Sequence, residues 1–162
     1  MTLRSCTSVH GALRATRYCL IAFLAFTAPS QVAAAERGTP EEARAMVERA
    51  IALFDSAGPE AALEAFNAPD PAFRDRDLYI FVVGPDGTVV GHAFDSGRLG
   101  LEVRTVKDSA GKPYGQQILD DATAEGVWID YLRTDPETGE ERHKSSWVKR
   151  HAGYIFGVGV YK

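Results

Sequence analysis

The feature that most constrains the fold is a set of three strand-like segments in the last part of the chain. Residues 127–133, 146–150 and 154–161 are rich in β-branched and aromatic side chains, and turn residues bound each segment. His151-Ala152-Gly153 leaves room only for a tight turn between the second and the third. The pattern predicts a three-stranded antiparallel meander in the middle of a sheet, so the rest of the chain must supply its cover and its edges.

Alternation along these strands gives the first indication of a binding site, because successive side chains point to opposite faces. Trp147 and Lys149 share one face of their strand, and Gly157 and Gly159 share one face of the last strand. Glycines along one face allow another element or a ligand to approach closely. Two interpretations of Lys149 stay open. It is either a surface lysine whose stem covers apolar residues or a cation on an aromatic wall that receives a carboxylate.

The first 35 residues have the composition of a cleavable secretory signal. Three arginines precede a short apolar run at 18–26, and three alanines precede Glu36. The run is short for a membrane-spanning helix, and an uncleaved anchor is the alternative interpretation. We therefore expect a signal peptide at 1–35, a single domain at 36–162, and a periplasmic or secreted location.

Removal of residues 1–35 would leave 15 basic and 22 acidic side chains, a net charge of −7, and no cysteine. An acidic domain is a poor partner for nucleic acid or for an anionic membrane surface. Without cysteine, the domain has neither a disulfide nor thiol chemistry. No later segment of the sequence is long and apolar enough for a membrane span. The composition thus predicts no nucleic-acid partner and no membrane span after signal removal.

The segments before the meander predict two helices followed by a hairpin. Thr39-Pro40-Glu41-Glu42 carries a capping box with proline at the first helical position, and an apolar stripe with helical spacing follows as far as Phe54. Turn residues at 84–87 indicate a tight connection. The expected elements are helices ending near 57 and 66, a proline-containing connector at 67–76, and strands at 78–83 and 88–94.

Residues 95–113 have no clear period, and such long loops in compact domains usually carry function or short helices. A helix is expected at 114–124. The whole pattern predicts an α+β domain with one five-stranded antiparallel sheet. The long N-terminal helix would cover one face, and the segment 95–125 would cover part of the other and leave a pocket beneath it.

The order and spacing of these segments resemble a single Cache domain, the PAS-like sensor module found outside the cytoplasm. The resemblance covers about residues 40–161 and rests on Leu78-Tyr79-Ile80-Phe81-Val82, Asp86-Gly87, Gly91-His92, Asp108 to Pro113, Gly126 to Tyr131, Asp135 to Gly139, Trp147 to Arg150 and Gly157 to Tyr161. It implies a five-stranded PAS-like sheet, a role in signal transduction, and a small-molecule pocket on the sheet face opposite the long helix. Ligands of the family are often short organic acids.

Two positions depart from the family's usual pattern. His92-Ala93 stands where members often have His-Pro, and Trp147-Val148-Lys149 stands where they have Tyr-Val-Lys. The second departure touches the expected pocket wall and leaves the identity of the ligand open. Family members are usually the outer part of a receptor with membrane helices and a cytoplasmic output. Because this chain stops at Lys162, we expect it to lack an output domain.

The expected ligand-binding residues combine the resemblance with strand alternation. Lys149 would pair with a ligand carboxylate, and His92 and Tyr131 would donate hydrogen bonds to it. The alternative for His92 is a core or rim histidine bonded to backbone. The apolar wall would be formed by Tyr79, Phe81 and Trp147, although aromatic residues in this pattern are also common in an ordinary core.

Neither catalysis nor metal binding is indicated by the sequence. The histidines after residue 35 are His92, His143 and His151, and the last two lie near opposite ends of one strand, too far apart to share an ion. No serine stands in a Gly-x-Ser-x-Gly motif. We therefore expect no enzyme activity, no metal and no other cofactor.

Two functions remain for the sequence alone. The first is a secreted sensor domain that captures a small molecule, with a short carboxylate as the expected ligand. The second is a protein-interaction module with a vestigial pocket, which would dock on the outer domain of a membrane sensor or on a transporter. The second is motivated by the expected lack of an output domain, because capturing a ligand alone signals nothing.

Overall fold

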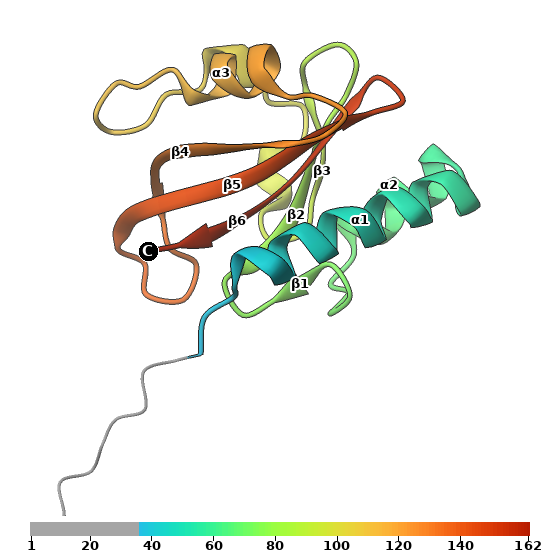
Figure 1. Cartoon of the computed structure of the whole chain (residues 1–162), viewed down its shortest axis with the longest axis horizontal. Coiled ribbons are helices and arrows are strands. Elements are labelled where there is room, and N and C mark those ends of the chain that lie inside the picture. The colour runs from blue at the N-terminus through green and yellow to red at the C-terminus, as the bar shows by residue number, and fades with distance from the viewer. Residues whose placement is uncertain (1–35) are drawn as a thin grey trace, which may run out of the picture. The chain divides into compact units, whose positions relative to one another are not determined.

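The computed structural model describes residues 36–162, and the predicted signal segment 1–35 lies outside them. The described part is an α+β domain in which one antiparallel sheet separates two layers of helix and loop (Figure 1). α1 (Pro40–Ala57) and α2 (Pro59–Asn67) cover one face, and α3 (Tyr114–Asp121) lies on the other. The predicted class and the predicted layers are therefore confirmed. Within residues 36–162, no helix is both long enough and apolar enough to cross a membrane.

The sheet has the C-terminal meander as its centre, as predicted. Its four long strands are, from one edge inward, β4 (Val127–Thr134), β5 (Glu141–His151), β6 (Tyr154–Tyr161) and β2 (Leu78–Val83). On the far side of β2, β3 (Val89–His92) pairs with its end and the two-residue β1 (Arg74–Asp75) pairs with its start. β1 lies inside the segment expected to be a connector. β5 begins at Glu141, five residues before the predicted strand.

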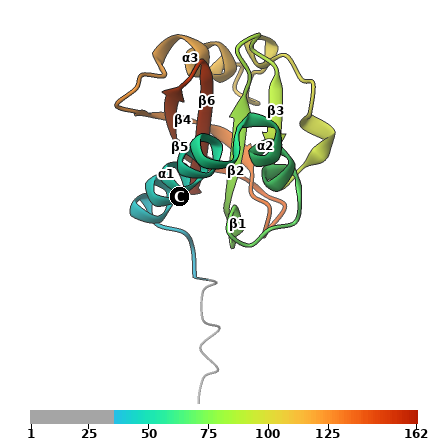
Figure 2. The same cartoon turned by 90° about the vertical axis from the view of Figure 1, so that its right-hand side faces the viewer.

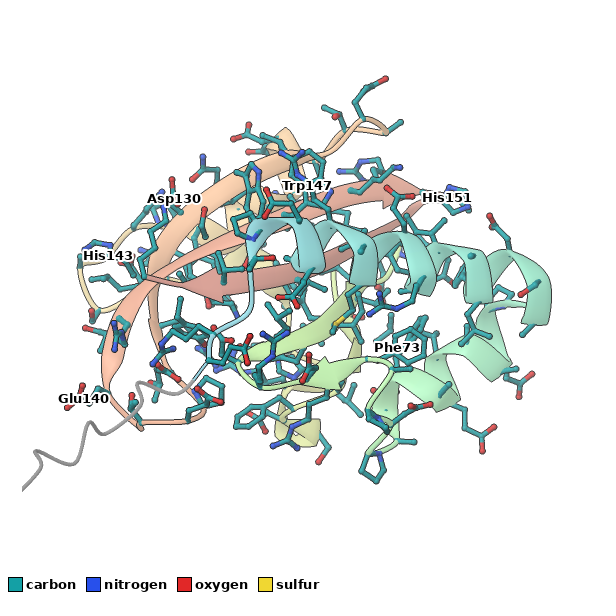
Figure 3. The ribbon with its side chains drawn as sticks, turned by 60° about the horizontal axis from the view of Figure 1, so that its bottom comes forward. Phe73, Asp130, Glu140, His143, Trp147 and His151 are labelled. Atoms are coloured by element: carbon teal, nitrogen blue, oxygen red, sulfur yellow. The ribbon has the colours of Figure 1, made fainter. Side chains whose placement is uncertain are left out.

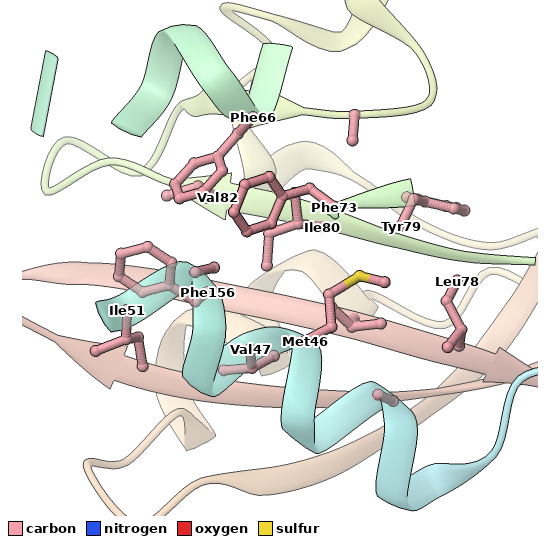
Figure 4. Packing of buried hydrophobic residues seen from close by; sticks show 14 of the residues in the cluster. Met46, Val47, Ile51, Phe66, Phe73, Leu78, Tyr79, Ile80, Val82 and Phe156 are labelled. Atoms are coloured by element: carbon pink, nitrogen blue, oxygen red, sulfur yellow. The ribbon is translucent and has the colours of Figure 1, made fainter. Parts of the chain in front are cut away.

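α1 begins at the predicted capping box and packs its apolar stripe against the sheet. The Thr39 hydroxyl accepts a hydrogen bond from the Glu42 N–H (3.2 Å), and the Glu42 carboxylate accepts one from the Thr39 N–H (2.8 Å). Figure 4 shows the resulting core, in which side chains of α1 and α2 meet those of β2 and β6. Figure 2 shows both helices in front of the strands. Each large apolar side chain buried here stabilises the fold by about 1.5–3 kcal/mol.

A second core lies on the opposite face of the sheet, beneath α3 and the segment that follows β3. This segment contains two short 3-10 turns, η1 (Ser96–Arg98) and η2 (Val103–Thr105). The buried side chains of this second core include Phe81, Val148 and Ile155 from the sheet. The irregular segment is therefore a structured cover, as its length suggested.

The outer edge of β4 is covered by the loop at 107–113. The Asp108 carboxylate accepts a hydrogen bond from the Leu132 N–H (3.1 Å), and the Lys112 ammonium donates to the Asp130 carbonyl. Asp108 also accepts the Lys112 N–H (2.8 Å), which closes the loop on itself. The loop is thus fastened to two backbone groups of the edge strand.

Candidate functional site

A cavity lies on the sheet face opposite α1, where the sequence predicted a pocket. The centres of water-sized molecules can occupy about 60 Å³ of it. One buried water needs roughly 10–15 Å³ on this measure, so the cavity suits a molecule of about four to six heavy atoms. Its lining residues are Tyr79, Phe81, Val83, Val89, His92, Arg98, Leu101, Val103, Val106, Tyr114, Ile118, Tyr131 and Arg133.

Four of the six predicted site residues line this cavity, namely Tyr79, Phe81, His92 and Tyr131. Tyr79 and Phe81 come from alternate positions of β2, and His92 pairs with Phe81 across the hairpin. Tyr131 comes from β4, the edge strand beyond β6 and β5. Alternation and pairing bring the four onto one face, and their role in binding stays a prediction.

Trp147 and Lys149, which the sequence analysis expected on the pocket wall, do not line this cavity. Trp147 lies on the face of β5 that α1 covers (Figure 3). The Lys149 ammonium is 2.7 Å from a carboxylate oxygen of Glu48, a residue of α1. The Arg44 guanidinium lies over the Trp147 ring, with its Cζ 4.3 Å from the ring centre. The cause is register: Lys149 pairs with Phe156, whose side chain belongs to the α1 core. This placement agrees with the first interpretation, in which Lys149 is a surface lysine.

His92 is buried at the cavity with a fixed ring orientation. The His92 Nδ1 accepts a hydrogen bond from the Asp95 backbone N–H (2.9 Å), and the His92 backbone N–H donates to the Asn67 side-chain oxygen (2.9 Å). Burial, and then the charges of Lys144 and Arg98, lower the pKa of His92 to about 4. The ring is therefore neutral at pH 7. Because Nδ1 is the acceptor, the proton resides on Nε2, which can donate to a ligand.

Tyrosine phenols supply further donors. The rings of Tyr114 and Tyr131 stack with their centres 4.0 Å apart, and the Tyr131 hydroxyl is 2.7 Å from the Ser146 hydroxyl. Burial raises the pKa of both tyrosines, so both phenols stay protonated. The cavity thus presents neutral O–H groups beside apolar walls.

The charged residues on the cavity lining are two arginines, Arg98 and Arg133, and within residues 36–162 no acidic side chain lines it. Arg98 ends the η1 turn that Asp95 caps, and its Nε is 3.3 Å from an Asp95 carboxylate oxygen. The chain as a whole has a net charge of −4. A cavity with only cationic charges in an acidic protein is the arrangement expected for an anion site.

Lys144 is a residue that the sequence analysis missed. It is 1% exposed, and its ammonium lies 3.5 Å from the Tyr161 hydroxyl and 3.7 Å from the centre of the Tyr79 ring. Among residues 36–162, no ion pair within 4 Å includes it. Burial lowers the pKa of Lys144. A buried ammonium without a carboxylate partner, behind a cavity wall, is a rare and costly arrangement.

The glycine face of β6 explains how Lys144 reaches this position. A Cβ atom at Gly159 would lie 2.2 Å from the Lys144 Cε, so the lysine stem crosses directly over this glycine. Gly157 is covered in the same way by the Phe81 ring, whose Cζ would lie 2.2 Å from a Cβ atom at this position. The predicted close approach is therefore made by side chains of the domain itself.

A signal for Lys144 was present in the sequence. It belongs to the same alternation set as Ser146 and Val148, and it stands opposite Tyr161 in the β5–β6 register. The strand-like segment was recognised by its composition only from Ser146 onward, so Lys144 was not assigned to a face of the sheet. Within the part of the chain that the structure describes, no group of three or more metal-ligating side chains is arranged to hold an ion.

Comparison with known proteins identifies the family. A family model described as a Cache domain matches residues 73–162, more than half of the chain. None of the curated proteins compared with the chain matches it.

Three solved structures have a similar fold. A methyl-accepting chemotaxis protein from Vibrio parahaemolyticus RIMD 2210633 has 21% identity and a TM-score of 0.62, over 75% of this chain and 86% of that one. The periplasmic sensor domain of a chemotaxis protein has 25% identity and a TM-score of 0.56, over 75% and 88%. A Cache chemosensory domain solved for carboxylic acid recognition has 18% identity and a TM-score of 0.57, over 75% and 86%. With the family match and the fold in agreement, this chain belongs to the Cache domain family.

Proposed function

We propose that this Cache domain is an extracytoplasmic sensor of a short carboxylic acid. The observation that carries the proposal is the cavity lining, which combines two arginines, a histidine donor and three tyrosines with apolar walls and includes no acidic side chain within residues 36–162. The volume of about 60 Å³ favours an acid of two or three carbons. A solved Cache domain of the same fold is described as recognising carboxylic acid, which agrees with this class.

Different residues would bind the carboxylate and the alkyl part of the acid. The Arg98 guanidinium can receive the carboxylate through paired N–H groups, since its Nη atoms are not used by the Asp95 contact at Nε. The His92 Nε2–H adds a neutral donor. The alkyl part of the acid would lie against Val89, Val103 and Ile118. Lys144, behind the Tyr79 ring, would add to Arg98 and Arg133 a third positive charge, in a medium of low dielectric constant.

A thermal-shift series tests the ligand class. Acetate, propionate, lactate and succinate would each be added to the purified chain, with methylammonium and glucose as cationic and neutral comparisons. At a concentration about a hundredfold above its dissociation constant, a bound acid stabilises the protein by about 2.7 kcal/mol and raises Tm accordingly. A rise in Tm with an amine or a sugar and with none of the acids would contradict the proposal.

A matched pair of variants locates the binding site. Arg98→Gln should lower the affinity for the bound acid about tenfold or more, because a charge-assisted hydrogen bond contributes about 1.5–3 kcal/mol. Arg104→Gln is the control, since Arg104 is exposed and bonded to Gln116 outside the cavity lining. Equal affinity in both variants would place the carboxylate elsewhere.

The predicted signal segment 1–35 agrees with a site of action outside the cytoplasm, as does the family. Fractionation of cells that express the full chain would test this location. Recovery of the protein only with the cytoplasmic fraction would contradict it.

A further inference from the structure

We infer that the buried cluster of Arg37, Asp77 and Asp135 responds to the ligand and thereby links the cavity to the start of the domain. This inference rests on the proposed carboxylate ligand.

The cluster holds the first described residues of the chain against the end of the sheet. Asp77 and Asp135 are both fully buried, at 0% exposure. An Arg37 Nη is 2.7 Å from an Asp135 carboxylate oxygen and 3.8 Å from one of Asp77. The other Asp77 oxygen accepts the Gly38 N–H at 2.7 Å. Two buried carboxylates thus share one guanidinium, which leaves the cluster with a net charge of −1.

Tyr161 connects this cluster to the cavity wall. Its backbone N–H donates to Asp77 (3.4 Å), and its hydroxyl donates to the Thr134 carbonyl (2.8 Å), next to Asp135 in the chain. Because that proton is committed, the hydroxyl acts as acceptor for the Lys144 ammonium and for the Tyr79 hydroxyl at 3.3 Å. Tyr161 therefore contacts the cluster by its backbone and the cavity's Tyr79 by its ring.

The charges of Lys144 and of the cluster determine whether ligand binding strengthens or weakens the hold of Arg37. The ammonium of Lys144 is linked to Asp77 through Tyr161, because it lies 3.5 Å from the Tyr161 hydroxyl and the Tyr161 backbone N–H donates to Asp77. In the empty protein, its single positive charge offsets the net −1 of the cluster. A carboxylate in the cavity competes with Asp77 for Lys144, and the cluster then depends more strongly on Arg37. Ligand binding is therefore expected to tighten the hold of Arg37 and Gly38 on the sheet.

Coupling between sites is reciprocal, so changes in the cluster must alter ligand affinity by the same factor. Asp77→Asn removes the competing charge and should raise the affinity for propionate. Arg37→Gln leaves two uncompensated carboxylates near Lys144 and should lower it. The expected changes are about fivefold in each direction, the lower end for coupled sites. Opposite signs are the decisive feature, because simple damage to the fold would lower affinity in both variants.

The experiment is isothermal titration with propionate at 0.15 M salt, where exposed charges are largely screened. Arg76→Gln is the control. Arg76 also fastens the start of the domain, through the Arg37 carbonyl (3.0 Å) and Glu42 (2.8 Å), but its guanidinium forms its ion pairs with Glu42 and Asp75 and not with the neighbouring Asp77 or with Asp135. It should leave propionate affinity unchanged. A second measurement, amide exchange of Gly38 by NMR, should slow about fivefold with propionate in the wild type and not in Asp77→Asn.

The outcomes separate this inference from the proposed function. If neither propionate nor another short acid binds the wild type, the proposed function fails and the inference with it. If propionate binds but the two cluster variants change affinity in the same direction, or not at all, the coupling is wrong and the carboxylate site stands. An effect of Arg76→Gln equal to that of Arg37→Gln would also overturn the coupling.

Discussion

The ammonium of Lys144 lies 3.7 Å from the centre of the Tyr79 ring, and Tyr79 is at the same time part of the cavity wall. A desolvated ammonium over an aromatic face gains about 2 kcal/mol, which offsets part of the cost of burying it. The charge is thus held behind the cavity wall by an aromatic side chain instead of a carboxylate, and it would act on an anion in the cavity across the Tyr79 ring.

Lys144→Met should weaken propionate binding about tenfold while leaving stability at pH 7 unchanged or higher, because a buried charge is removed. The pH dependence has a definite sign. Burial lowers the pKa of Lys144 below 10.5, so the unfolded chain binds more protons just below pH 10.5, and wild-type stability rises with pH there. Urea unfolding between pH 8 and about 10.5 should show this rise in the wild type and in the exposed-site control Lys107→Met, but not in Lys144→Met.

His92 should make the domain sensitive to acid. Its pKa of about 4 in the folded protein lies below the unfolded value of 6.5, so stability is present above about pH 6.5 and is lost as the pH falls towards 4. The gap corresponds to about 3 kcal/mol. His92→Gln should lose less stability over this interval, as measured by urea unfolding at pH 7 and pH 4.5. Parallel losses in the two proteins would contradict the assignment.

Lys149→Ala should leave propionate affinity unchanged and reduce the free energy of unfolding by less than about 1 kcal/mol. Its ion pair with Glu48 is partly exposed, and such pairs contribute little. A double-mutant cycle with Glu48→Ala, read by chemical denaturation, measures the pair. A loss of affinity comparable to that of Lys144→Met would return Lys149 to the site.

Gly159→Ala should destabilise the domain by about 1–3 kcal/mol, because the new methyl group would overlap the Lys144 Cε at 2.2 Å and the Ser146 hydroxyl at 2.4 Å. Part of this cost should disappear in the Lys144→Ala background, where the lysine stem is absent. Chemical denaturation of the four proteins gives the interaction energy. Strict additivity of the two changes would show that the stem does not cross this glycine.

The order of the elements was predictable because local chemistry marks their ends. The capping box at Thr39 and Glu42 starts α1, and Gly58 with Pro59 separates it from α2, as the structure confirms. The four predicted residues on the cavity lining were identified from alternation within β2, β3 and β4 together with the resemblance to the Cache family, which indicated the face of the sheet that carries the pocket. Local sequence was sufficient for the order of the elements, and the resemblance was needed for the face.

The faces of β5 were not predictable in the same way. Alternation correctly grouped Trp147 with Lys149, but only pairing with Phe156 and Val158 shows that this group faces α1. Arg98 was missed because its position depends on a short turn capped by Asp95 in a segment without period. Both errors concern long-range register and loop geometry, which propensity and spacing do not encode.

The fastening of Asp108 and Lys112 to β4 has a consequence for self-association. An open edge strand is a template on which another chain can add a strand, and β-rich proteins that expose one risk growing into fibrils. Here the Leu132 N–H and the Asp130 carbonyl already have hydrogen-bond partners in the loop at 107–113. A second molecule would therefore have to displace this loop before it could pair with β4. The double variant Asp108→Ala/Lys112→Ala should therefore aggregate faster on mild heating, even where its folded state is little changed.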